Sequence, residues 1–64
     1  KRKHWEVDWF PYDAKLKVHV MKTRVFSPHM ESYQVRYAAE DMLQNFMKSG
    51  KHCLPSFDLR EVLK

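Results

Sequence analysis

Four histidines and one cysteine are the side chains of this sequence that could bind a metal ion: His4, His19, His29, His52 and Cys53. A shared metal needs ligands at short, paired spacings, such as two residues apart on a strand or four apart on a helix. No pair in this set has either spacing, and the side chains of the adjacent His52 and Cys53 diverge. The sequence therefore predicts no metal site, and it contains no other cofactor motif.

Two carboxylates, Glu6 and Asp8, have the spacing of a general acid and base that share one face of a strand. Each also has an expected basic partner on the neighbouring strand, so a salt-bridged surface explains both. Glu40 and Asp41 fall on the expected solvent face of a helix. Because the sequence has neither a glycine-rich phosphate loop nor a nucleophile beside a base, we expect a protein that is not an enzyme.

The basic side chains have the most informative distribution. The net charge is +4, from twelve Lys and Arg against eight Asp and Glu. Seven of these bases lie in residues 1–24, whereas residues 25–47 carry one. This asymmetry suits a basic surface that faces a polyanion, and a solubilising surface explains it equally well. The candidate nucleic-acid contacts are Lys1, Arg2, Lys3, Lys15, Lys17, His19, Lys22 and Arg24.

The first element that must position these residues is a β-hairpin, predicted over about residues 4–26. Apolar and polar residues alternate from His4 to Phe10 and again from Lys15 to Val20, as in half-buried strands. Residues 11–14 interrupt the alternation and predict a four-residue loop. Near Met21 the alternation changes phase, which indicates a bulge or a strand end.

The register that closes this loop gives each face of the hairpin a consistent chemistry. One face is apolar, with Trp9 opposite Leu16, Val7 opposite Val18 and Trp5 opposite Val20. The other face is charged, with Asp8 opposite Lys17 and Glu6 opposite His19. We therefore expect the apolar face to be buried and the charged face to meet solvent.

A single amphipathic helix is predicted over about residues 28–49. Ser27 supplies a hydroxyl cap, and Pro28 fits the first turn, where its missing N–H costs nothing. Gly50, the only glycine, falls where a left-handed C-terminal cap belongs. The stripe expected to cover the hairpin comprises Val35, Ala38, Ala39, Met42, Leu43 and Phe46.

Two tyrosines, Tyr33 and Tyr37, lie one turn apart on the helix side away from this stripe. Their position suits a protein-partner contact or a base-stacking platform. Packing against the C-terminal segment is a further explanation.

The C-terminal segment, residues 50–64, fits two structures. Ser56 could cap a short second helix, or the alternation around Phe57 and Leu59 could form a third strand. We favour the helix. With no internal repeat and no linker, residues 1–64 form one small α+β domain, an antiparallel hairpin packed on one amphipathic helix.

Three motifs support a resemblance to known DNA-binding families: Trp5-Glu6-Val7-Asp8-Trp9, then Arg24-Val25-Phe26-Ser27, then the helical pair Ala38-Ala39. The chain over roughly residues 5–47 resembles the ethylene-response-factor class of DNA-binding domains and the arm-binding domains of phage integrases. The resemblance implies a three-stranded sheet on one helix, with the sheet laid in the DNA major groove. A flanking strand would then precede Lys1 in a longer chain. The implied contacts are Lys15, Lys17, His19, Lys22 and Arg24.

The remaining expectations concern the setting of the chain. One cysteine cannot form an internal disulfide, which favours a reducing, intracellular compartment. No segment approaches the roughly 20 apolar residues of a membrane span. The first residue is Lys1 rather than Met, as in a processed product, an excised domain or part of a longer chain; we expect a monomer or one part of a larger complex.

The leading hypothesis is a non-enzymatic nucleic-acid-binding module, for DNA or RNA, that uses the basic outer face of the hairpin and the Lys1-Arg2-Lys3 run. The alternative is a small protein-interaction module, such as an inhibitor or a subunit. It would bind its partner through an exposed strand edge or through the Tyr33 and Tyr37 face.

Overall fold

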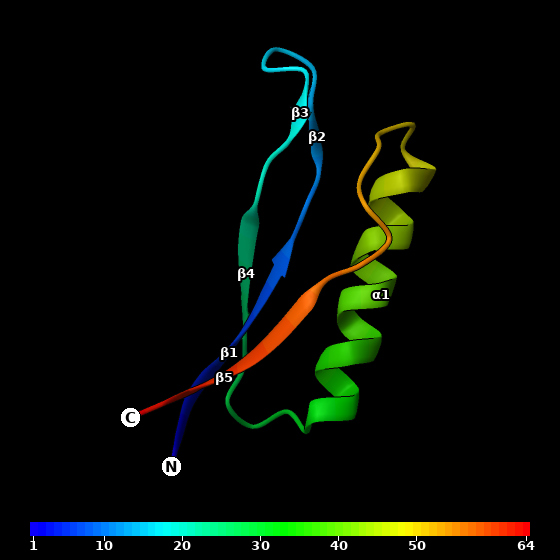
Figure 1. Cartoon of the computed structure of the whole chain (residues 1–64). Helices are drawn as coiled ribbons and strands as arrows, with labels where there is room; N and C mark the ends of the chain where they lie inside the picture. The colour runs from blue at the N-terminus through cyan, green and yellow to red at the C-terminus, as the bar shows by residue number, and fades with distance from the viewer.

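One helix packs on one face of a three-stranded antiparallel sheet, and a two-stranded extension continues the sheet at one end (Figure 1). The structure is a computed structural model that describes all residues from Lys1 to Lys64. Its elements are β1 (Arg2–Trp9), β2 (Tyr12–Asp13), β3 (Val18–His19), β4 (Lys22–Phe26), α1 (Ser32–Lys48) and β5 (Asp58–Leu63). The predicted α+β class is confirmed.

The sheet has the order β4-β1-β5, so β1 is its central strand. Both neighbours run antiparallel to β1, and β4 and β5 are therefore parallel to each other. Helix α1 connects these two outer strands and covers one face of the sheet, while the other face has no covering layer (Figure 1).

The hairpin is longer than the sequence indicates. β1 pairs with β4 so that Trp9 lies opposite Lys22. The same register continues through β2 and β3, where Tyr12 lies opposite His19. Between these pairs, the amide of Val20 donates to the carbonyl of Pro11 at 2.9 Å. Pro11 therefore lies between β1 and β2, within the hydrogen-bonded part of the hairpin, and the predicted loop over residues 11–14 is wrong.

The observed turn is built around Asp13. Its carboxylate accepts hydrogen bonds from the amides of Lys15 and Leu16 at 2.8 and 3.0 Å. Its carbonyl accepts from the amide of Lys17 at 2.7 Å, and Lys17 takes a left-handed φ of 59°. An Asp side chain that binds the backbone amide two residues on favours a turn at that place, and the observed turn accordingly follows Asp13.

The predicted cross-strand pairs are consequently wrong, since Trp9 lies opposite Lys22 and not opposite Leu16. The same correction applies to Val7 with Val18, Trp5 with Val20, Asp8 with Lys17 and Glu6 with His19.

The shift is by an even number of residues, so the side chains of β1 keep their predicted faces. Leu16 and Val18, predicted to be buried, are exposed instead. Lys22 and Arg24, predicted on the basic outer face, lie opposite Trp9 and Val7 on the inner face.

The C-terminal segment forms β5 and not the favoured second helix. In β5, Leu59 lies opposite Val7 on the face that α1 covers, and Phe57 and Leu59 pack against the core. Before β5, the amide of Tyr12 donates to the carbonyl of His52 at 2.8 Å. The segment therefore follows the edge of β1 that β4 leaves free and supplies the third strand expected upstream of Lys1.

Helix α1 begins at Ser32, four residues later than predicted. Ser27 instead belongs to a turn in which its hydroxyl accepts from the amide of His29 at 3.2 Å. The segment before α1 is fixed by β1, because the Arg2 guanidinium donates to the carbonyls of Pro28 and Met30 at 2.7 and 2.9 Å. These carbonyls are directed at Arg2 instead of along a helix axis, so the helix starts after them.

The C-terminal end of α1 is as predicted. Gly50 has a φ of 86°, and its amide donates to the carbonyl of Met47 at 3.1 Å. This left-handed residue ends the helix, as expected for a glycine cap.

The core lies between β1 and α1. Trp5, Val7, Val35 and Ala39 form one buried cluster, and Leu43 is buried further along α1. The indole N–H of Trp5 donates to the carbonyl of Met30 at 2.9 Å, so this buried ring has no unpaired donor. The predicted inward faces of the first strand and of the helix are confirmed.

Candidate functional site

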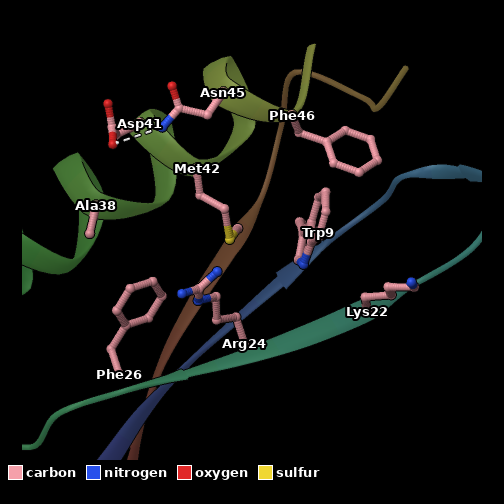
Figure 2. A pocket seen from close by; sticks show the side chains of 9 residues that line it. All are labelled: Trp9, Lys22, Arg24, Phe26, Ala38, Asp41, Met42, Asn45 and Phe46. Carbon is pink, nitrogen blue, oxygen red and sulfur yellow. Dashed lines mark hydrogen bonds between the residues drawn. The ribbon is translucent and has the colours of Figure 1, made fainter. Parts of the chain in front are cut away.

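An open groove of about 670 Å³ runs between β4 and α1. Its lining combines three aromatic rings with two cations, and consists of Trp9, Lys22, Arg24, Phe26, Ala38, Asp41, Met42, Asn45 and Phe46. Figure 2 shows Arg24 rising from β4 between the rings of Phe26 and Trp9 toward Met42 on the helix. We call this surface the β4–α1 groove.

The cations reach this groove because of the strand register. Lys22 and Arg24 lie opposite Trp9 and Val7, so they share the sheet face that α1 covers. However, β4 is an edge strand, and both side chains remain exposed. The structure thereby places two positive charges beside the apolar core and in contact with solvent.

Neither Lys22 nor Arg24 forms an ion pair, although Asp41 lines the same groove. The Arg24 guanidinium instead lies 5.7 Å from the centre of the Phe26 ring. Asp41 accepts a hydrogen bond from the side-chain amide of Asn45 at 3.2 Å (Figure 2). Both cations are therefore free to bind an anion.

The aromatic part of the groove is held by contacts between β1 and α1. The rings of Trp9 and Phe46 meet edge to face, with their centres 4.9 Å apart. The ammonium of Lys51 lies 5.5 Å from the centre of the Phe46 ring and adds a third cation at this end. Trp9 and Phe46 are half-buried, so part of each ring is available to a ligand.

The uncovered face of the sheet carries a closed network of charges. Arg60 on β5 binds Glu6 at 2.6 Å and Asp8 at 2.5 Å, and both acids lie on the central strand. Asp8 is buried and also accepts a hydrogen bond from the hydroxyl of Thr23 at 2.6 Å. The acids thus obtain their partners from β5 and β4 instead of from Lys17 and His19.

Hydrogen bonds to Glu6 from His4, at 3.0 Å, and from Arg60 hold the pKa of this carboxyl below its ordinary value. The same bond to Glu6 raises the pKa of Arg60. The charged forms of both groups are therefore stabilised, and the guanidinium of Arg60 is occupied by Glu6 and Asp8.

The remaining predicted contacts fall into two separate places. Lys15 and Lys17 lie in the turn at the tip of the hairpin, and the His19 ring packs edge to face on Tyr12 with centres 5.3 Å apart. At the opposite end of the sheet, a second hollow is lined by Lys1, Arg2, Lys3, Pro28, His29, Glu61, Leu63 and Lys64. Arg2 is occupied there by a 2.6 Å ion pair with Glu61.

Tyr33 and Tyr37 are exposed on the side of α1 away from the sheet, with ring centres 6.5 Å apart. They are not covered by the C-terminal segment, because that segment lies along β1. Packing against it is therefore ruled out as the reason for their position.

Other chemistry is sparse in this fold. No group of three or more His, Cys, Asp or Glu side chains is arranged to hold a metal ion. Burial raises the pKa of the Cys53 thiol, which keeps it protonated at neutral pH. The only helix, α1, lacks the length and apolar character of a membrane-crossing helix.

Sequence reasoning identifies Lys22 and Arg24 but not the groove that surrounds them. The sequence pattern places Trp9 and Phe46 in the core and Phe26 at a strand end. The sequence feature that could have located the groove is the change of phase near Met21. There the apolar residues switch to the other face of the strand, and Lys22 and Arg24 take the positions that face inward in β4. Comparison of the chain with family models, curated proteins and solved structures gives no match.

Proposed function

We propose that this chain is a non-enzymatic module that binds single-stranded nucleic acid in the β4–α1 groove. The observation that carries the proposal is the placement of two unpaired cations, Lys22 and Arg24, among the rings of Trp9, Phe26 and Phe46. Cations and exposed rings in one open groove are the features that single-strand binders combine.

Each part of the groove has a counterpart in a nucleotide. Phosphate oxygens would pair with Lys22 and Arg24, an interaction that releases counterions and weakens with salt. A base would stack on the exposed part of Trp9 or Phe46, which typically contributes about 1–3 kcal/mol per base. The side-chain oxygen Oδ1 of Asn45 accepts no hydrogen bond from the protein. It is therefore available to a donor on a base edge.

This proposal differs from the surface implied by the resemblance to sheet-in-groove DNA-binding domains. That resemblance would use the uncovered sheet face, which carries Glu6 and Asp8 with Arg60 as their shared partner. A phosphate there would have to compete with two carboxylates for one guanidinium. The β4–α1 groove has only Asp41 as an acid and two cations without partners.

The test is the double substitution Lys22→Gln and Arg24→Gln, measured by binding to fluorescent oligo-dT and oligo-U at a series of salt concentrations. We expect weaker binding and a salt slope lower by roughly one unit for each phosphate that the variant no longer neutralises. The matched control is Arg36→Gln with Lys48→Gln, which removes the same charge from exposed positions on α1. Equal weakening in both doubles would mean diffuse charge attraction and would exclude the groove.

A protein partner is the second candidate, and one observation favours it. β4 is an edge strand, and all of its residues except Phe26 are exposed. An extended peptide could pair with β4 and place alternate side chains in the groove. Binding of that kind depends on backbone hydrogen bonds, so it should survive both the charge substitutions and high salt.

A further inference from the structure

The distal half of the hairpin, residues 12–20, forms an arm that projects beyond the C-terminal end of α1 (Figure 1). Every side chain from Ala14 to His19 is exposed. The helix and β5 do not cover this arm, so its residues are not explained by the core.

The tip presents one apolar side chain between two cations. Leu16 is 64% exposed, and its neighbours in the turn are Lys15 and Lys17. The one acid of the arm, Asp13, uses its carboxylate to accept the amides of Lys15 and Leu16. The tip therefore combines an exposed apolar group with net positive charge.

The conformation of this tip is fixed before any ligand arrives. Asp13 binds the amides of three successive residues, and the left-handed φ of 59° at Lys17 closes the turn. A turn held by these bonds loses little conformational entropy when it inserts into a partner. Leu16 is thus presented on a stiff support.

We propose that the arm tip inserts Leu16 between stacked bases where a duplex adjoins the single strand held in the β4–α1 groove. This inference rests on the proposed function. Apolar side chains inserted between base steps unstack them, and flanking cations bind the adjacent phosphates. Lys15 and Lys17, which flank Leu16 in the chain and are exposed, would bind those phosphates. Lys22 lines the groove and lies two residues after the end of the arm, so the two surfaces are close in the chain.

The test uses a duplex with a single-stranded overhang and 2-aminopurine at the first base pair. Fluorescence of 2-aminopurine rises when the base is unstacked, so the parent protein should raise it. Leu16→Ala should abolish the rise, whereas binding of the isolated single strand should be unchanged. Leu16→Phe should preserve the rise, because a ring also fills the gap between bases.

Leu63→Ala is the matched control, because Leu63 is 63% exposed and lies on β5, away from the arm. It should leave the fluorescence rise intact. An equal decrease for Leu16→Ala and Leu63→Ala would overturn the inference.

The remaining outcomes separate this inference from the function on which it rests. Single-strand binding without any 2-aminopurine response would overturn insertion and leave the proposed function standing. No binding to any oligonucleotide would overturn both. A third outcome is binding to vesicles of anionic phospholipid with no 2-aminopurine response. If Leu16→Ala abolished that vesicle binding, the tip would meet a lipid surface, and insertion between bases would be overturned.

Discussion

The centre of the sheet and the β4 side of the molecule use their charges differently. In the centre, Arg60 is shared by Glu6 and Asp8, and at the end of the same two strands Arg2 binds Glu61. On the β4 side no cation has an acidic partner within ion-pair distance, and these cations are Lys15, Lys17, Lys22 and Arg24. Arg60 and Arg2 thus link β1 and β5, whereas Lys15, Lys17, Lys22 and Arg24 remain available to a ligand.

The two regions also differ in how they use apolar side chains. Trp5 and Val7 are buried between the sheet and α1, whereas Leu16 in the arm is exposed. A domain of this size has little stability to spare, so its folding depends on the few buried residues of the centre. Substitutions should therefore affect folding in the centre and binding on the β4 side.

The largest expected effect is the loss of folding in Trp5→Ala. Truncating a buried Trp typically costs about 3–5 kcal/mol, a large part of the stability of a small domain. This variant also loses the hydrogen bond from the indole N–H to Met30. Thermal melts should show Trp5→Ala mostly unfolded and Leu16→Ala close to the parent. Trp9→Ala should fall between them, since Trp9 is half-buried.

The next effect compares two arginines. Arg60→Gln should lower the melting temperature, because it leaves the buried Asp8 without its cation. Arg24→Gln removes no ion pair and should leave the melting temperature unchanged. Circular-dichroism melts of both variants at equal salt would decide this, and equal destabilisation would mean that Arg24 also supports the fold.

The smallest effect is the dependence of stability on pH through Glu6. Its ordinary pKa is 4.5, and its pKa in the folded chain is lower because of His4 and Arg60. Its contribution to stability is therefore present above pH 4.5 and is lost as the pH falls through the folded-state value. Urea midpoints measured on both sides of pH 4.5 should fall less on acidification in Glu6→Gln than in the parent.

The sequence predicts the faces of the elements better than their pairing. Alternation around Trp5 and the helical stripe through Val35 and Ala39 identify the inward side chains. Alternation has a period of two, so it cannot distinguish registers that differ by an even number of residues. The choice depends on the turn. Pro11 is a plausible strand breaker, but the carboxylate of Asp13 accepts the amides of the observed turn.

The strand β5 and the groove depend on tertiary contacts that the sequence does not show. Ser56 is a reasonable helix cap, but the free edge of β1 needs a partner and the alternation at Phe57 and Leu59 supplies it. The groove requires the spacing between β4 and α1, which only the folded chain defines. Lys22 and Arg24 can therefore be identified as candidates from the sequence, but their aromatic surroundings cannot.

The position of β1 between β4 and β5 has a consequence for how fast the chain folds. The hairpin contacts are local, whereas Arg2 lies opposite Leu63 and Asp8 opposite Asp58. Chains whose native contacts join distant residues fold slowly, because the intervening loop must close before those contacts form. We therefore expect the hairpin to form first and β5 to pair with it later. Until then one edge of β1 stays unpaired. During that interval the exposed strand edge and Trp5 would be open to association with other chains, so refolding yield should fall as protein concentration rises.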